Sequence, residues 1–350
     1  MEPVVTEPAV ANRSAGSPEG DAHRLRTGIA WTVGLVVLLL AVGLAVPGLR
    51  EVLERVAHAS SGWLVLAVVL ELASCLGYVA TVRLVLRRGP APMVRRLAWA
   101  EMAFGAVVPA GGAGGLAVGA WAMRARGVSW SRVANRSAVI FLLTSAVNVT
   151  VLALAGLGVA VGVGAGQPRV VYGLVPAGVA LAAIAFFALL PRVADRTRFG
   201  TRQGRIGDIL RSTATWVRDT EKTALQGDWR VLGSVGYLIF DIAVLWACMR
   251  AIGVTPPLLA LVVGYQVGYL ANLVPIPGGV GALEGGLVGA LVLYGLPAAP
   301  IAAAVIIYHA IALWVPVLGG TIGFVRLRAA VNAGAHEDAV HEPDEAISQA

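Results

Sequence analysis

The hydrophobic pattern of this 350-residue chain is a series of long apolar runs separated by short polar segments. A helix needs about 20 apolar residues to cross the hydrocarbon core of a bilayer. Runs that meet this length, each predicting a spanning helix, lie at residues 27–49, 62–86, 137–163, 170–190, 231–252 and 299–325. The expected fold class is therefore an all-α polytopic membrane protein with six spanning helices.

A further apolar segment, Leu97–Met123, is broken by glycine and proline and has arginines on both sides. Basic flanks mark the cytoplasmic side of a membrane protein, so both flanks should be cytoplasmic. The two halves of the segment, of about 12 residues each, are too short for two crossings at about 1.5 Å per residue. The segment is therefore predicted to enter and leave the membrane on one side, as a re-entrant hairpin.

The segment Leu258–Gly295 is broken in the same way at PIPGG, and this bend carries no basic residue. Because successive spans cross the membrane in alternate directions, the segment should begin and end outside. This favours a second re-entrant hairpin that enters from the opposite side. Two full crossings are the alternative, because each arm approaches spanning length. The same charge bias places both chain termini and the linker 192–230 in the cytoplasm.

The expected organisation has three parts. Residues 1–26 are polar and expected to be disordered, and residues 329–350 form an acidic tail that is also expected to be disordered. Between them, residues 27–328 form the membrane domain, whose halves cover residues 27–166 and 167–328. Within the linker 192–230, apolar residues at helical spacing with a basic opposite face predict an interfacial helix.

The two broken segments resemble each other. The letters GGAGGL at 111–116 align with GGVGAL at 278–283, an offset of about 167 residues. The same offset lays span 62–86 over span 231–252, so the halves have the same order of elements and opposite orientation. Paired, broken segments in two inverted halves indicate a transporter binding site. The alternative is that the glycines only allow helices to pack closely.

The broken segments could supply an anion site at the membrane midplane. A half-helix begins after each glycine cluster, and its free N–H groups and dipole could hold a phosphate. Glycine also lets the backbone approach a ligand closely. The candidate residues of this kind are Pro109, Gly111, Gly112, Gly114, Pro275, Pro277, Gly278, Gly279 and Gly281.

Four acidic residues and one histidine lie inside the apolar segments. A charge at the centre of a spanning helix costs roughly 2.5–3.5 kcal/mol, so such residues are candidates for function. Each has a plainer alternative: Glu284 could neutralise its own helix end, Glu101 could be shallow enough to hydrate, and the histidine could be a packing residue. The candidates for binding a cationic headgroup or protons are Glu71, Glu101, Asp241, Glu284 and His309.

Composition excludes several other functions. The net charge of +7 is spread over short loops, so nucleic-acid binding is not expected. The two cysteines, Cys75 and Cys248, lie in apolar runs and predict no disulfide framework. The sequence has no metal-ligand spacing and no nucleotide or dinucleotide fingerprint, so we expect neither a metal nor a cofactor.

The two broken segments and the last apolar helix resemble parts of the transmembrane flippase domain of the lysylphosphatidylglycerol synthase/flippase family. The likeness rests on PAGGAGGL followed by an arginine-rich turn, on VPIPGGVGALE and on the late YH…WVP…GG helix, and it covers about residues 27–328. It implies a stand-alone lipid-translocating unit without the aminoacyltransferase domain, with Pro277, Gly278, Gly279, Gly281 and Glu284 at its central site. One departure is His309, where an arginine is expected in many relatives.

The sequence thus predicts a flippase or lipid transporter of a bacterial inner membrane rather than an enzyme. Its partner would be a membrane lipid whose headgroup phosphate binds between the hairpin tips. A membrane transferase acting on lipid-linked substrates is one alternative, although no convincing nucleophile is apparent. A carrier of small solutes or ions is the other.

Overall fold

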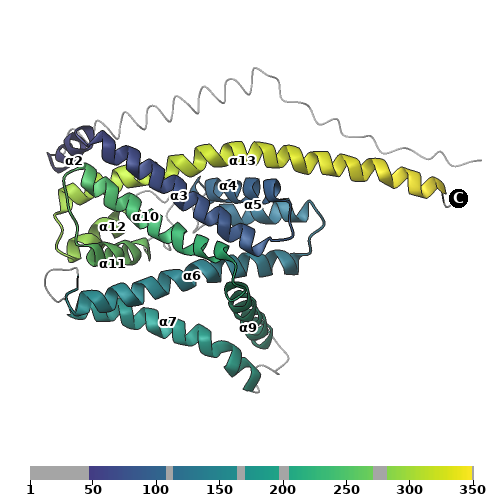
Figure 1. Ribbon diagram of the computed structural model, residues 1–350, viewed down its shortest axis with the longest axis horizontal. Coiled ribbons are helices and arrows are strands. Elements are labelled where there is room, and N and C mark those ends of the chain that lie inside the picture. The colour runs from purple at the N-terminus through teal and green to yellow at the C-terminus, as the bar shows by residue number, and fades with distance from the viewer. Residues whose placement is uncertain (1–46, 108–112, 164–169, 197–204, 271–281, 349–350) are drawn as a thin grey trace, which may run out of the picture. The chain divides into compact units, whose positions relative to one another are not determined.

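The computed structural model describes residues 47–107, 113–163, 170–196, 205–270 and 282–348, and these parts of the chain contain helices and no strand. Contacts divide the chain into two units, 1–54 and 55–350. Helix α2, Pro47–Ala57, crosses the boundary between them, and the helices from α3 onward belong to the second unit (Figure 1). The predicted all-α polytopic class is confirmed, since five described helices are long and apolar enough to span a membrane.

The five helices correspond to five of the predicted spans, while span 27–49 lies mostly outside the described residues. They are α3 (Ser61–Val85), α6 (Trp130–Ala160), α7 (Val170–Arg196), α10 (Leu232–Ala251) and α13 (Ala298–Ser348). The predicted interfacial helix is α9 (Arg205–Ala224), which packs on α6 and α7. Helix α13 continues through 329–348, where an unstructured tail was expected.

Each broken segment forms two short helices. The first gives α4 (Ala91–Val107) and α5 (Ala113–Arg124), and the second gives α11 (Leu258–Tyr269) and α12 (Ala282–Leu293). The helices of each pair pack against one another. A 12-residue helix is about 18 Å long, well short of the hydrocarbon core of about 30 Å. The bends at 108–112 and 271–281 lie outside the described residues.

Several helices end where the sequence places a glycine before an apolar residue. Gly127 and Gly253 have φ angles of 73° and 83°, a region that glycine enters without steric cost. The N–H of the following valine donates to the carbonyl five residues earlier, as in a Schellman motif. Local sequence therefore fixes the ends of α5 and α10.

The packing of the helices follows the predicted repeat. We call α3–α6 the first repeat and α10–α13 the second repeat. Helix α3 packs on its counterpart in the second repeat, α10. Helix α4 of the first repeat packs on α13 of the second, and their counterparts α11 and α6 pack on each other in the same way. The contacts within the repeats match in the same way, α4 with α5 and α11 with α12. The two repeats are thus arranged around an approximate two-fold relation.

Helices α3 and α10 run antiparallel, since their contacts move backwards along one as they advance along the other. The contacting pairs are Ser60–Ala251, Trp63–Trp246, Ser74–Tyr237 and Thr81–Ser234. Close approach depends on Gly77 and Gly233, because a Cβ on Gly77 would lie 2.7 Å from the carbonyl oxygen of Gly233. If both helices span the bilayer, the two repeats have opposite orientations, as an inverted repeat requires.

The end of α3 is joined to the start of α10 at the protein surface. Arg87 donates to Asp228 at 2.5 Å, and Asp228 also accepts from the backbone N–H of Arg230 at 3.0 Å, which caps the 3₁₀ turn Trp229–Val231. The pKa of Asp228 lies below its ordinary value, mainly because its carboxylate accepts a hydrogen bond from the backbone N–H of Arg230. The hydrogen bond from the guanidinium of Arg87 has the next largest effect. This contact holds the two repeats together at one end of the bundle.

Candidate functional site

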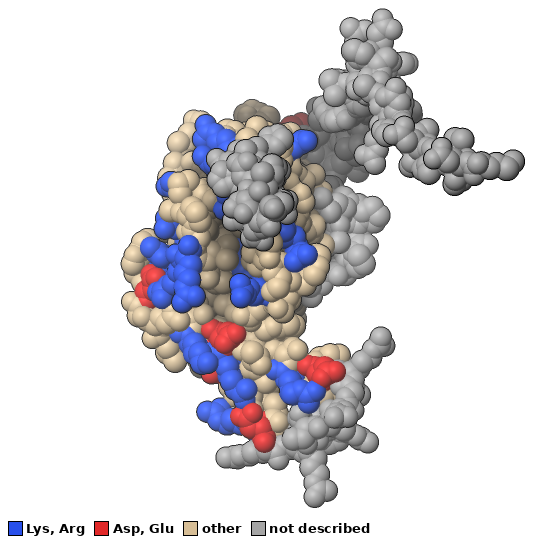
Figure 2. Space-filling model, turned by 90° about the vertical axis from the view of Figure 1, so that its right-hand side faces the viewer, with Lys and Arg blue, Asp and Glu red and all other residues tan. Residues whose placement is uncertain are grey.

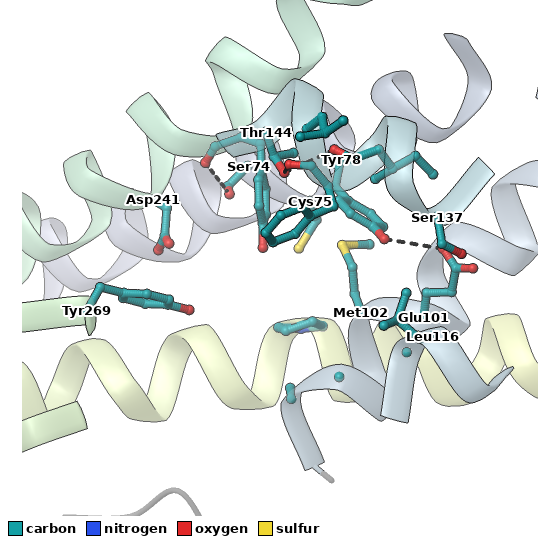
Figure 3. Close-up of a pocket in the computed structure, with 18 of the residues that line it drawn as sticks. Ser74, Cys75, Tyr78, Glu101, Met102, Leu116, Ser137, Thr144, Asp241 and Tyr269 are labelled. Carbon is teal, nitrogen blue, oxygen red and sulfur yellow. Dashed lines mark hydrogen bonds between the residues drawn. The ribbon is translucent and has the colours of Figure 1, made fainter. Parts of the chain in front are cut away.

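A cavity of about 700 Å³ lies between the two repeats (Figure 3). Its walls come from α3, α4, α5, α6, α10, α11 and α13, and Phe187 of α7 with Thr213 and Trp216 of α9 complete its lining. Pockets of about 300–1,000 Å³ are typical of small-molecule sites. Because residues of both repeats line it, the cavity exists only when the repeats are packed together.

The first polar cluster in the cavity contains two carboxyl groups, one from α3 and one from α10. Asp241 accepts hydrogen bonds from the hydroxyl groups of Tyr265, at 2.5 Å, and Tyr308, at 2.9 Å. Glu71 is only 5% exposed, and its Oε1 accepts a hydrogen bond from the thiol of Cys75 at 3.6 Å. Its Oε2 has no partner among the described residues. Both carboxyl groups line the same cavity.

The second polar cluster is a buried ion pair between the first broken segment and α6. Arg136 contacts Glu101 through both terminal nitrogens, Nη1 to Oε1 at 2.5 Å and Nη2 to Oε2 at 2.7 Å, and both side chains are about 95% buried. Tyr78 donates to the same carboxylate at 3.2 Å. Gly119 of α5 lies against the pair, and a Cβ there would meet both charged groups. A two-point arginine–carboxylate contact is strong and fixes the orientation of both groups.

Two predicted site residues contact each other outside the lining of this cavity. Glu284, in the first turn of α12, lies 3.1 Å from Nδ1 of His309 on α13, and both side chains are partly exposed. The structure therefore brings Glu71, Asp241 and Glu101 together in one cavity and places the Glu284–His309 contact elsewhere. Gly114 is buried in α5 beside Gly115, which does line the cavity.

The remaining predicted site residues are those of the two bends. They lie outside the described residues, so the proposed phosphate cradle stays a prediction: Pro109, Gly111, Gly112, Pro275, Pro277, Gly278, Gly279 and Gly281.

Sequence reasoning missed the partners of the acidic residues. Arg136 looks like one more arginine flanking the first broken segment, although an acid as deep as Glu101 needs a cation nearby. Tyr265 and Tyr308, which donate to Asp241, were not singled out. One signal was available for the pairing of the acids: VVLELA at 68–73 and LIFDIA at 238–243 place an acid at the same position of an apolar run.

Basic side chains gather at one end of the second unit. Figure 2 shows this face, which carries exposed lysine and arginine residues at the ends of α3, α4, α5, α6 and α9. The exposed members are Arg87, Arg88, Arg95, Arg124, Arg126, Arg132 and Lys222. Such a bias is typical of the cytoplasmic end of a membrane protein.

Comparison with known proteins agrees with this architecture. Over 93 residues the chain is 37% identical to a protein of Methanothermobacter thermautotrophicus named UPF0104 membrane protein. The matched region covers 26% of this chain and 26% of that protein, so the chain matches about a quarter of the relative's length. The sequence profile of the family described as "Lysylphosphatidylglycerol synthase TM region" matches residues 29–320. The chain is therefore a multi-pass membrane protein that belongs to the lysylphosphatidylglycerol synthase TM region family.

Proposed function

We propose that this protein is a lipid flippase or lipid transporter that moves a phospholipid headgroup between leaflets through the cavity between its repeats. One observation carries the proposal: a cavity of about 700 Å³, lined by both repeats, places polar and charged side chains inside an apolar helical bundle. The headgroup would travel through this polar interior while the acyl chains stay in the surrounding lipid.

The outer surface and the family support the same function. Side chains that face away from the cavity are large and apolar, such as Leu154 on α6 and Val179 on α7, which are 66% and 63% exposed. Such surfaces suit contact with acyl chains. The profile that matches this chain describes the membrane region of a lipid-modifying protein, which points to a lipid rather than to a small soluble solute.

The two broken segments are proposed to act as re-entrant hairpins from opposite leaflets. The helices of each pair pack together and are shorter than most spanning helices, and the repeats are related by antiparallel packing of α3 on α10. With the basic end in the cytoplasm, both chain termini are cytoplasmic and the protein resides in the cell membrane. Alternating exposure of the cavity would follow from motion of one repeat against the other.

The test is leaflet exchange of fluorescent lipids in vesicles that contain the purified protein. The panel contains an anionic, a zwitterionic and an aminoacylated phospholipid, and exchange of at least one should be faster than in protein-free vesicles. Leu116→Trp should reduce exchange, because Leu116 lines the cavity. Leu154→Trp is the matched control, since it makes the same change on the outer surface.

No acceleration for any lipid of the panel would overturn the proposal. Equal exchange by both tryptophan variants would place the lipid path outside this cavity. Formation of a new lipid product in the same vesicles would favour a membrane transferase instead.

A further inference from the structure

The carboxyl groups of Glu71 and Asp241 lie near the middle of the packing between the two repeats. At an offset of about 170 residues, α3 overlays α10 and Glu71 corresponds to Asp241. The antiparallel contacts of these helices run from Ser60–Ala251 to Thr81–Ser234, so Glu71 and Asp241 lie at about the same level of the two helices, and both line the cavity. Two equivalent acids are therefore found where the repeats pack together.

The surroundings of the two acids are not equivalent. Tyr265 of α11 and Tyr308 of α13 donate to Asp241. At the offset of about 167 residues that relates these helices to α4 and α6, the corresponding residues are Ala98 and Phe141, which carry no hydroxyl group. Asp241 thus has two hydroxyl donors that suit an anion, while Glu71 has one weak thiol donor, Cys75, and one oxygen without a partner among the described residues.

Two carboxylates that share one cavity between apolar helices repel each other, so holding both negatively charged is costly without a compensating positive charge. None of the described arginine, lysine or histidine side chains contacts either acid. The titratable groups that face the pair from α3, α10, α11 and α13 are neutral when protonated, and they are Cys75, Tyr237, Cys248, Tyr265, Tyr269 and Tyr308. With no cationic side chain among the described residues at the pair, a bound cation or a proton is left to supply the compensating charge.

We propose that this pair is a proton-binding site in which Glu71 takes up one proton from cavity water and returns it to water, while Asp241 stays charged. Protonation converts the Glu71 carboxylate to a carboxylic acid, and release restores the carboxylate and gives the same proton back to water. Because the pair bridges α3 and α10, its charge changes the attraction between the two repeats. Coupling of proton movement to lipid movement rests on the proposed function, whereas the proton site itself does not.

The proton site can be tested without any transport measurement. Infrared difference spectra of the protein in lipid nanodiscs, taken between about pH 5 and pH 9, detect the carbonyl band of a protonated carboxyl and its shift in D₂O. We expect such a band near neutral pH in the unmodified protein and its loss in Glu71→Gln. In Asp241→Asn the neighbouring charge is gone, so the band should disappear at a pH lower by about one unit or more.

Glu221→Gln is the matched control, because Glu221 is exposed on α9 and does not line the cavity. Its spectrum should keep the protonated carboxyl band. Replacing sodium with a large organic cation tests for an alkali-ion site: a band that appears only without sodium would overturn the proton site. Absence of a band that depends on Glu71 would overturn it as well.

Lipid exchange measured on the same preparations separates this inference from the proposed function. If the band is present but no lipid exchanges, the proton site stands and the flippase proposal fails. If lipid exchanges and the band is absent, the flippase proposal stands and the proton site fails.

Discussion

The two repeats hold their short helices in different ways. In the first repeat, a buried ion pair between Glu101 and Arg136 ties α4 to α6. At an offset of about 167 residues, the corresponding positions of the second repeat are Gly268 and Ala303, which carry no charge. There α11 approaches α12 closely through Gly268, whose added Cβ would lie 2.6 Å from Cα of Leu287, just as α5 approaches α4 through Gly115 in the first repeat.

This difference indicates a division of roles. A buried, two-point ion pair fixes a helix in one orientation, because moving either partner leaves a charge without compensation. Close packing through glycine has no such directional requirement. The second repeat also has a partly exposed contact, Glu284–His309, in place of a buried pair. We therefore expect α4 and α5 to be the fixed element and α11 and α12 to be the movable one.

The largest effect should come from breaking the ion pair. Arg136→Met leaves the Glu101 carboxylate buried without its cation, which should lower the free energy of unfolding by about 3–5 kcal/mol. Thermal unfolding in detergent measures this loss. The double variant Arg136→Met with Glu101→Leu removes both charges and should recover most of it. A double variant as unstable as the single one would show that the pair does not hold α4 to α6.

An intermediate effect is expected from Gly268→Ala in the second repeat. The new methyl group would meet the backbone of Leu287, and overpacking of this kind costs about 1–3 kcal/mol. Gly289→Ala is the control on α12, because a Cβ there meets nothing within 4 Å. The melting temperature should fall for Gly268→Ala and not for Gly289→Ala. Equal melting temperatures would mean that α11 and α12 can shift apart without cost.

The smallest effect is expected for Glu284 and His309. Partly exposed polar contacts of this kind contribute about 0–1 kcal/mol, so a double-mutant cycle with Glu284→Gln and His309→Gln should give a coupling energy in that range. The same cycle on Glu101 and Arg136 should give a larger value. Similar values for both pairs would remove the distinction drawn here between a fixed and a movable repeat.

Much of the architecture was predictable because membrane helices follow simple rules. The lipid core leaves unpaired backbone groups without partners, so long apolar runs must be helical. Helices at five predicted spans, the helix α9 in the linker and the paired short helices were found for this reason. The basic residues also gather at one end, as their placement around the first broken segment predicted.

The candidate site was predictable only in part. An acid inside an apolar run stands out in a sequence, and so Glu71, Glu101 and Asp241 were found. Their partners do not stand out: Arg136 resembles any flanking arginine, and Tyr265 and Tyr308 resemble packing residues. Glu284 and His309 stood out for the same reason as the other acids, yet they face each other away from the cavity lining.

The sequence by itself determined which segments are helices, which of them are broken, and that the two halves repeat the same order of elements. These properties depend on local hydrophobicity, on glycine and proline, and on the distribution of charge along the chain. Only the tertiary structure decided which acid received a cation, which received tyrosine hydroxyl groups, and which kept an oxygen without a described partner. Those outcomes depend on side chains from helices far apart in sequence, which come together only when the two repeats pack around α3 and α10.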